Sequence, residues 1–415
     1  MMTELRNGHR VQLLEGGGEF FEALVQAIDA SEVEVRMETY IFHIDSSGER
    51  VALALEQAAQ RGVKVYMTAD GIGTPGLSGD WVSRFRHCGV MWHVFMPLGR
   101  FGILFPSRWR RMHRKLCVVD GHIGFCGGIN VLDDYVDPNH GELVQPRLDF
   151  AVRVQGPLVA DMHQAMARLW WRQTLTQDVG PQSFSAAWRE LQRTLRRSLR
   201  GAAGQDDSPG RLAPHGSAIP AVEHLVPAAL LLRDNLSNRR KIERAYLAAI
   251  SSARQEIVVA NAYFLPGARL RRALVLAAER GVRVRLLLQG RYEYFMQYHA
   301  SRPVYAAMLA AGVEIHEYAA SFLHAKVAVV DGRWATVGSS NLDPLSLLLA
   351  HEANVEVHDE AFALALLARL ELAMRSGGTM VDAAVFAARP WQQRAKESVA
   401  YALMRLALLL VGRRY

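Results

Sequence analysis

Two stretches of this chain, His113–Asn130 (HRKLCVVDGHIGFCGGIN) and His324–Asn341 (HAKVAVVDGRWATVGSSN), carry the same polar pattern inside apolar sequence. Each stretch reads HxKxxxxD and is followed, at the same spacing, by GxxN. With ordinary residue usage, one such match has a chance probability of roughly 10⁻⁷ per start position. Two matches therefore indicate that the chain contains a duplicated unit.

The sequence around the two motifs repeats as well. Amphipathic and Val-rich segments predict a helix followed by a strand at Glu22–Asp29 and Glu34–Phe42, and again at Arg244–Ile250 and Glu256–Phe264. Further matching pairs are Leu53–Val65 with Ala273–Val284, where a glycine fits the helix C-cap, and Cys88–His93 with Ala311–His316. Strands that alternate with helices predict an α/β fold with a sheet in each half.

Length and composition limit the function classes. A chain of 415 residues exceeds the size of a single core, and an apolar content of 50% excludes a disordered chain. Three cysteines without a CxxC motif favour a reducing compartment. Met1–Arg10 does not resemble a signal peptide, and the apolar run Val399–Val411 is too short to span a bilayer. The net charge of +7 favours an anionic partner: nucleic acid, an acidic membrane surface or a phosphate substrate.

We predict four segments along the chain. Residues 1–190 form the first repeat, 191–220 a basic helix end and a linker, 221–385 the second repeat, and 386–415 a basic amphipathic C-terminal tail. The linker is assigned to the Gly-, Pro- and Ser-rich stretch Gly201–Pro220, which has no apolar periodicity. The tail suits either a lipid headgroup region or a terminal helix packed on the second repeat.

The motif spacing has a chemical interpretation. On a strand, residues two apart point to the same face, so His113 with Lys115, and His324 with Lys326, can address one anionic group. Glycines permit tight turns or close backbone approach, and asparagines supply amide donors. We therefore predict that the substrate is also contacted by Gly127, Asn130, Gly338 and Asn341.

The paired motifs resemble the HKD signature of the phospholipase D superfamily, and the resemblance spans both halves. It implies a duplicated α/β fold, in which two pseudo-two-fold-related mixed-sheet domains flanked by helices share one site. It also implies that one imidazole attacks a phosphodiester to give a phosphohistidine, while the other acts as acid and base. We assign the nucleophile to His113 and the acid/base role to His324, although the sequence does not separate them. No metal or other cofactor is expected.

The same resemblance adds supporting residues. It implies a carboxylate that orients each histidine, and Asp149 and Glu352 match those positions. Asp120 and Asp331 complete the catalytic motifs, although in this superfamily they are thought to support the fold more than the chemistry. Ser339 matches a serine that is common in the glycine turn and is predicted to contact the substrate, whereas the first half has Gly128 there.

An insertion distinguishes the two repeats. The segment from Gly89 to His113 is twice as long as that from Gly312 to His324, and it mixes apolar, aromatic and Arg residues. Such a segment suits an anionic lipid interface, although a buried loop with an Arg-rich rim is the alternative. The residues predicted to contact the membrane are Phe101, Ile103, Leu104, Phe105, Arg108, Trp109, Arg110 and Arg111.

Within the superfamily, three strings resemble bacterial cardiolipin synthases of type B, the form without N-terminal transmembrane helices: Arg110–Lys115, Asn261–Phe264 and His324–Ser346. This implies phosphatidyl transfer between two phosphatidylglycerol molecules, with release of glycerol. It also implies peripheral attachment to the cytoplasmic face of the bacterial cell membrane, and no nucleic acid partner. The sequence does not indicate an oligomeric state. The alternatives are a phospholipase D-type hydrolase, a nuclease and an inactive membrane scaffold.

Overall fold

A computed structural model of the chain describes residues 5–77, 79–97, 109–138, 140–177, 224–234, 238–292, 295–343 and 350–411. The strands of the first half are β1 (Arg6–Glu15), β2 (Glu34–Thr39), β3 (Lys64–Asp70), β4 (Met91–Phe95), β6 (Lys115–Val119), β7 (Ile123–Gly127) and β10 (Phe150–Gln155). Those of the second half are β11 (Val226–Arg233), β12 (Glu256–Asn261), β13 (Arg283–Gln289), β14 (Glu314–Tyr318), β15 (Lys326–Val330), β16 (Trp334–Gly338) and β17 (Ala350–His358).

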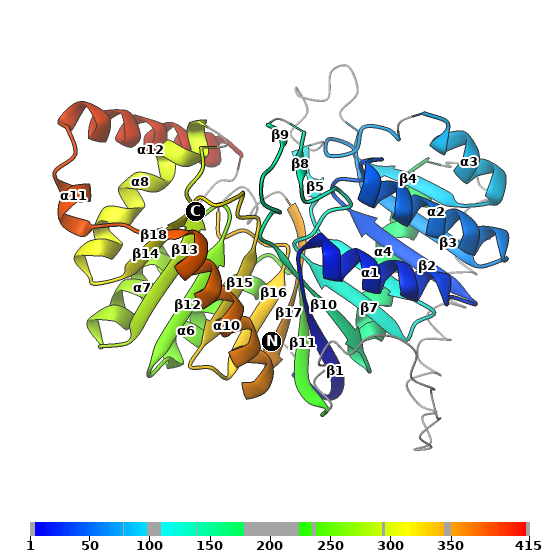
Figure 1. Cartoon of the computed structure of the whole chain (residues 1–415), viewed down its shortest axis with the longest axis horizontal. Helices are drawn as coiled ribbons and strands as arrows, with labels where there is room; N and C mark the ends of the chain where they lie inside the picture. The colour runs from blue at the N-terminus through cyan, green and yellow to red at the C-terminus, as the bar shows by residue number, and fades with distance from the viewer. Residues whose placement is uncertain are drawn as a thin grey trace.

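These strands form one continuous mixed sheet, in which the two halves meet at the antiparallel pair β1–β11 (Figure 1). Outward from this pair, the first half runs β1-β10-β7-β6-β2-β3-β4 and the second runs β11-β17-β16-β15-β12-β13-β14. Corresponding strands therefore occupy corresponding places. The duplicated α/β fold is confirmed, but the halves share one sheet instead of keeping a sheet each.

Short strands complete the sheet. β18 (Gly378–Met380) extends the edge of the second half beyond β14. β5 (Arg111–Met112) pairs with β17 and so carries a segment of the first half onto the second. β8 (Val136–Asp137) and β9 (Gly141–Glu142) form a separate hairpin.

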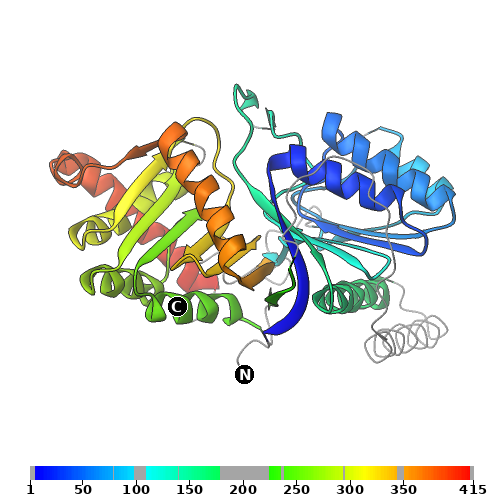
Figure 2. The same ribbon diagram turned by 60° about the horizontal axis from the view of Figure 1, so that its bottom comes forward.

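Helices cover both faces of the sheet (Figure 2). The first half contributes α1 (Gly16–Asp29), α2 (Ser46–Gln60), α3 (Trp81–Cys88) and α4 (Leu158–Gln177). The second half contributes α6 (Lys241–Ser252), α7 (Ala268–Glu279), α8 (Phe295–Ala310) and α10 (Glu360–Gly377), followed by α11 (Ala383–Ala387) and α12 (Trp391–Val411). In Figure 2, α10 (orange) lies on the same side of the sheet as the blue helices of the first half.

One hydrophobic core joins the two halves. It contains Phe150 and Met162 from the first half together with Val355 and Phe362 from the second, all fully buried. Helix α4 of the first half contacts β11, and α10 of the second half contacts β1. Each half thus packs a helix across the central seam, and this shared burial holds the halves in a fixed relation.

The predicted local structure is present. The predicted helices and strands coincide with α1, β2, α2, β3 and with their counterparts α6, β12, α7 and β13. Gly62 and Gly281 follow their helices with φ of 92° and 87°, the left-handed conformation that makes glycine the favoured residue there. The linker 191–220 lies outside the described residues, and the four segment boundaries remain predictions. No helix in the described part of the chain has the length and apolarity to cross a bilayer.

The first repeat contains a buried ion pair that the second repeat lacks. Arg114, between His113 and Lys115, donates to Glu38 on β2 through both Nε and Nη2 (Nη2–Oε1 2.8 Å). Both side chains are buried. In the second half the corresponding positions are Ala325 and Ala260, so both partners are absent together. This concerted difference indicates that the pair acts as a unit in packing the first half.

We predict that Glu38→Ala lowers the free energy of unfolding by about 3–5 kcal/mol, because it leaves the Arg114 guanidinium buried without its counter-charge. The double variant Arg114→Ala/Glu38→Ala should lose less than the sum of the two single variants. Urea denaturation of the four proteins measures this coupling. Additive losses would show that the two side chains stabilise the fold independently.

Candidate active site

The two motif histidines lie just before the strands that carry their lysines. β6 begins at Lys115 and β15 at Lys326, so the histidines belong to the preceding loops and not to the strands as predicted. Their backbones are nevertheless fixed: His113 N donates to the His351 carbonyl (3.0 Å) and His324 N to the Leu148 carbonyl (2.9 Å). Both bonds cross from one half to the other.

The carboxylates that follow these two carbonyls pair with the same histidines. His113 Nδ1 lies 3.0 and 3.1 Å from the two Glu352 oxygens, and His324 Nδ1 lies 2.6 Å from Asp149 Oδ2. Each imidazole is therefore held by a carboxylate of the other half. Because Nδ1 faces the carboxylate, each ring turns Nε2 away from it.

The two lysines are buried beside these pairs. Lys115 Nζ donates to the His113 carbonyl (2.7 Å), and Lys326 Nζ lies 2.8 Å from His324 Nδ1 and 3.9 Å from Asp149 Oδ2. Burial, together with the charge of Lys326, lowers the pKa of Lys115 to about 7. Two ammonium groups in one buried site are suited to an anionic ligand.

The two histidine–carboxylate pairs have different electrostatics. Burial would raise the pKa of Glu352, but the charges of His113 and Lys115 and the Ser339 hydroxyl hold it below its usual value. Burial raises the pKa of Asp149 to about 6. Burial and both lysines lower the pKa of His113, but the Glu352 carboxylate partly offsets them. Burial and the same lysines lower the pKa of His324 further, well below its usual value. Environments that separate the pKa values of paired groups are typical of acid–base sites.

The motif aspartates do not belong to this site. Asp120 accepts the backbone N–H groups of residues 32–34, and Asp331 accepts those of residues 254–256, at 2.8–2.9 Å. Each aspartate follows a five-residue strand that begins at the motif lysine, so roughly 15 Å separates it from the histidine. Their inclusion among the catalytic residues is therefore corrected to a structural role: they bind the turn before β2 and β12.

The glycine turns also act mainly through packing. A Cβ on Gly127 would lie 2.5 Å from Ala151 Cα, and one on Gly338 would lie 2.2 Å from Asn354 Oδ1, so both glycines allow neighbouring strands to approach. The Ser339 hydroxyl donates to Glu352, which makes it a positioning group instead of the predicted substrate contact. At Gly128 a Cβ would lie 2.2 Å from Asp149 Oδ1, so the shorter carboxylate occupies the space that a serine would need.

The two motif asparagines are buried near the site and differ in their contacts. Asn130 Oδ1 accepts the Ile41 N–H at 3.2 Å. Asn341 Oδ1 has no hydrogen-bond partner among the described residues. Their contact with a substrate remains a prediction. Within the same described residues, no three His, Cys, Asp or Glu side chains converge on a potential metal site.

Two positioning residues were missed by the sequence analysis. Asp70 Oδ2 accepts the Met112 N–H (2.8 Å), and Gln289 Oε1 accepts the Leu323 N–H (3.1 Å). Met112 and Leu323 directly precede the two histidines, and Asp70 and Gln289 end the equivalent strands β3 and β13. Polar residues at the ends of two parallel strands in matching repeats were the available signal.

The predicted membrane-contacting segment is only partly described. Phe101, Ile103, Leu104, Phe105 and Arg108 lie outside the described residues. Trp109 is partly exposed and Arg110 is exposed, and their lipid contact remains a prediction. The prediction for Arg111 is wrong. Its side chain is only 12% exposed, because its guanidinium pairs with the buried Asp70 (3.1 Å) and donates to the Met96 carbonyl.

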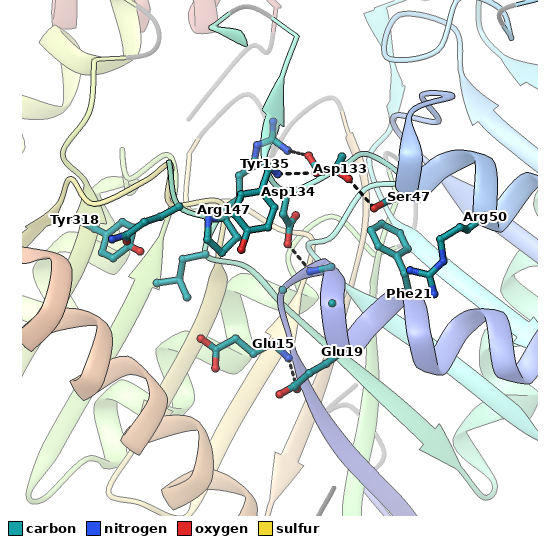
Figure 3. Close-up of a pocket in the computed structure, with 16 residues that line it drawn as sticks. Glu15, Glu19, Phe21, Ser47, Arg50, Asp133, Asp134, Tyr135, Arg147 and Tyr318 are labelled. Atoms are coloured by element: carbon teal, nitrogen blue, oxygen red, sulfur yellow. Dashed lines mark hydrogen bonds between the residues drawn. The ribbon is translucent and has the colours of Figure 1, made fainter. Parts of the chain in front are cut away.

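A separate pocket of about 520 Å³ lies beside the site, where α1 begins (Figure 3). Its wall includes Arg147 and Leu148, which precede Asp149, and Tyr318 from the second half. Asp134 accepts the Gly17 N–H, and burial raises the pKa of this carboxyl to about 6. The exposed start of α1 is thus already capped, and the pocket contains neither motif histidine nor motif lysine.

Comparison with protein families identifies both repeats. A family model described as "Cardiolipin synthase, PLD-like domain" matches residues 24–170 and 246–372. Each matched segment contains one motif histidine, its lysine and one orienting carboxylate. The duplication in the sequence, the strand order and the family match therefore agree.

Individual relatives extend over almost the whole chain. Cardiolipin synthase B of Salmonella typhi is 36% identical over 416 residues, which cover 98% of this chain and 90% of that protein. Cardiolipin synthase B of Escherichia coli K12 is 35% identical over 421 residues, which cover 99% and 92%. The crystal structure of phosphatidylserine synthase from Haemophilus influenzae matches with a TM-score of 0.66 at 13% identity, covering 99% of this chain and 96% of that one. At this identity the similarity concerns the fold.

We predict that Asp331→Ala lowers the free energy of unfolding at pH 7 by about 1–3 kcal/mol, because three backbone N–H groups lose a charged acceptor. The backbone N–H groups lower the pKa of Asp331 from its usual 3.8. The aspartate therefore contributes stability above pH ~4, and this contribution is lost as the pH falls through the lower folded-state pKa. Urea denaturation at pH 7 and pH 3 checks both the loss and its decrease in acid.

Asp331→Asn is the matched control, since it keeps an acceptor and tolerates the left-handed backbone found here, where φ is 50°. Its stability should fall between those of the other two proteins. Unchanged stability in Asp331→Ala would contradict the structural role.

Proposed function

The chain belongs to the cardiolipin synthase family with a PLD-like domain, and we propose that it transfers a phosphatidyl group from one phosphatidylglycerol to another, giving cardiolipin and glycerol. The predicted resemblance to this family is thus confirmed. Relatives named cardiolipin synthase identify the chain as a phosphatidyltransferase. The observation that carries the mechanism is the crossed arrangement of two histidine–carboxylate pairs beside two buried lysines.

In the first step, His113 is the proposed nucleophile. Glu352, whose pKa is held low, keeps the imidazole proton on Nδ1, so that the Nε2 lone pair faces the phosphodiester. A P–N bond forms at Nε2 as the bond between phosphorus and the glycerol oxygen breaks. His324 gives a proton to that oxygen, and glycerol leaves.

In the second step, a hydroxyl of another phosphatidylglycerol enters. His324, now neutral, takes the proton of this hydroxyl as its oxygen attacks phosphorus, and the P–N bond breaks. The product is cardiolipin, and both histidines return to their starting states. Water in place of the lipid hydroxyl would give phosphatidic acid, so the acceptor must be favoured over water in the site.

The lysines are proposed to contact the non-bridging oxygens of the phosphodiester. Their charges lower the pKa of His324 in the free enzyme, which disfavours the protonated acid. A bound phosphodiester brings a negative charge that offsets them, so substrate binding favours protonation of His324. The general acid is then charged mainly when a substrate is present.

The lipid substrates require contact with a membrane. We propose peripheral attachment at the cytoplasmic face, with phosphatidylglycerol drawn from the bilayer. Support comes from the net charge of +7 and from the three cysteines, which are all unpaired.

Mass spectrometry of products from the purified protein and phosphatidylglycerol vesicles tests the function. We expect cardiolipin and glycerol in equal amounts. His113→Ala and His324→Ala should each reduce turnover by at least 10³-fold. The first change removes the proposed nucleophile, and the second removes the proposed acid and base. His358→Ala, at the exposed end of β17, is the matched control and should retain activity.

Phosphatidic acid as the main product would instead identify a hydrolase. Substantial activity in either site variant would contradict a single shared site. In a reaction quenched with denaturant at neutral pH, the covalent phosphatidyl group should map to the peptide that contains His113. Recovery on the peptide that contains His324 would reverse the assigned roles.

The pH dependence tests the charge of Lys115. Its ammonium loses a proton in the free enzyme as the pH rises through about 7. We therefore expect kcat/KM for phosphatidylglycerol in mixed micelles to fall above pH ~7, by up to tenfold per pH unit. The fall in kcat should begin at higher pH, because the bound phosphodiester stabilises the ammonium. Lys115→Arg, which keeps its charge, should retain only the fall that comes from the deprotonation of His324, so its kcat/KM should decline less steeply above pH ~7 than that of the wild type. A flat wild-type kcat/KM up to pH 9 would contradict this assignment.

A further inference from the structure

The outward face of α12 carries a row of exposed apolar side chains. Trp391, Val399, Leu403 and Leu406 are 71%, 58%, 51% and 53% exposed. Val399, Leu403 and Leu406 are spaced by three or four residues, and Trp391 lies about two turns earlier, so all four lie along one side of the helix. The small residues on this side, Ala395 and Ala402, are exposed as well.

The opposite face of α12 attaches the helix to the protein. Glu397 and Ala400 are buried, and Tyr401 and Met404 pack against the core of the second half. Arg389 Nη1 donates to the buried Glu397 carboxylate at 2.8 Å. A surface helix normally turns its large apolar side chains inward and its charges outward. On α12 an acidic residue faces inward, while one Trp, one Val and two Leu face outward.

Cationic side chains border the apolar row. Helical geometry places Arg394 and Arg405 along one border, where both are exposed, and Lys396 along the other. The Arg405 guanidinium lies 5.8 Å from the centroid of the Tyr401 ring, which holds it at the side of the helix. An apolar row with cationic borders matches the boundary between acyl chains and anionic headgroups.

The helix is also suitably placed. Figure 1 shows α12 along the upper edge of the second half, at the same end of the molecule as β5, the strand that leads into His113. A bilayer that contacts α12 therefore lies at the end of the molecule where β5 leads into the loop of His113.

We propose that the outward face of α12 docks the protein on an anionic bilayer, with Trp391, Val399, Leu403 and Leu406 in the acyl region and the flanking cations at the headgroups. This inference rests on the proposed function, since phosphatidylglycerol is presented by a bilayer. The cations favour a lipid surface over a second copy of the chain, which would bring the same positive borders together. The row is also one helix wide, whereas a stable protein interface needs ~800 Å² on each partner.

Vesicle flotation tests the proposal. The full-length protein should float with vesicles of phosphatidylglycerol and phosphatidylethanolamine, and less with phosphatidylcholine alone. Leu403→Ser/Leu406→Ser should weaken flotation on the order of tenfold or more, because two leucines no longer enter the acyl region. Arg394→Glu/Arg405→Glu should remove the preference for anionic vesicles. Circular dichroism and the thermal midpoint confirm that each variant is folded.

Leu364→Ser/Leu372→Ser is the matched control, because these leucines on α10 are also exposed, at 47% and 60%. It should float as the wild type does. Unchanged flotation of the folded α12 variant would overturn the proposal, as would a shift from dimer to monomer in light scattering without loss of flotation. Flotation measures membrane binding and needs no turnover. It therefore tests the docking proposal independently of product formation. A protein that floats through α12 but makes no cardiolipin would contradict the proposed function alone.

Discussion

The bond between each motif histidine and a carboxylate of the opposite half is the constraint on which the arrangement of the site depends. His113 is oriented by Glu352 and His324 by Asp149, so neither half contains a complete histidine–carboxylate pair. A displacement of the halves by one ångström would break both pairs at once. The continuous sheet through β1–β11 and the core shared by α4 and α10 therefore serve the site directly, because they fix one half against the other.

This arrangement concentrates charge in a buried place. Two lysines, two carboxylates and two imidazoles lie together, and the carboxylates offset the lysines only while the imidazoles are neutral. Burial lowers the pKa of both histidines, which is consistent with this balance. A bound phosphodiester adds one negative charge, which can be balanced by protonation of one imidazole. In the proposed mechanism, binding of the anionic substrate therefore favours protonation of His324, the general acid.

The sequence predicted the features that repeat and missed the contacts that cross between repeats. Motif spacing and glycine C-caps predict the helices, the strands, both histidines and both lysines, since these depend on local pattern. The two carboxylates followed from the resemblance to the phospholipase D superfamily and not from the pattern itself. The local pattern does not reveal which carboxylate pairs with which histidine, because Glu352 lies 239 residues from His113 in the sequence. Asp120 and Asp331 were included as catalytic since they share the motif, yet a strand of five residues carries them to its far end. Arg111 was assigned to lipid by composition, but the end of β3 places Asp70 beside it.

One difference between the repeats gives the two histidine–carboxylate pairs unequal surroundings. A perfectly symmetric site would give both histidines the same pKa and the same tautomer, whereas transfer requires one nucleophile and one acid. In the second half, Ser339 donates to the longer Glu352 and helps to keep it ionised. In the first half, Gly128 leaves room for Asp149 to approach without a hydroxyl donor, and burial raises the pKa of the Asp149 carboxyl to about 6. In the proposed mechanism, this serine-to-glycine difference, matched by glutamate to aspartate, gives the two histidines different carboxylate partners and so favours different roles for them.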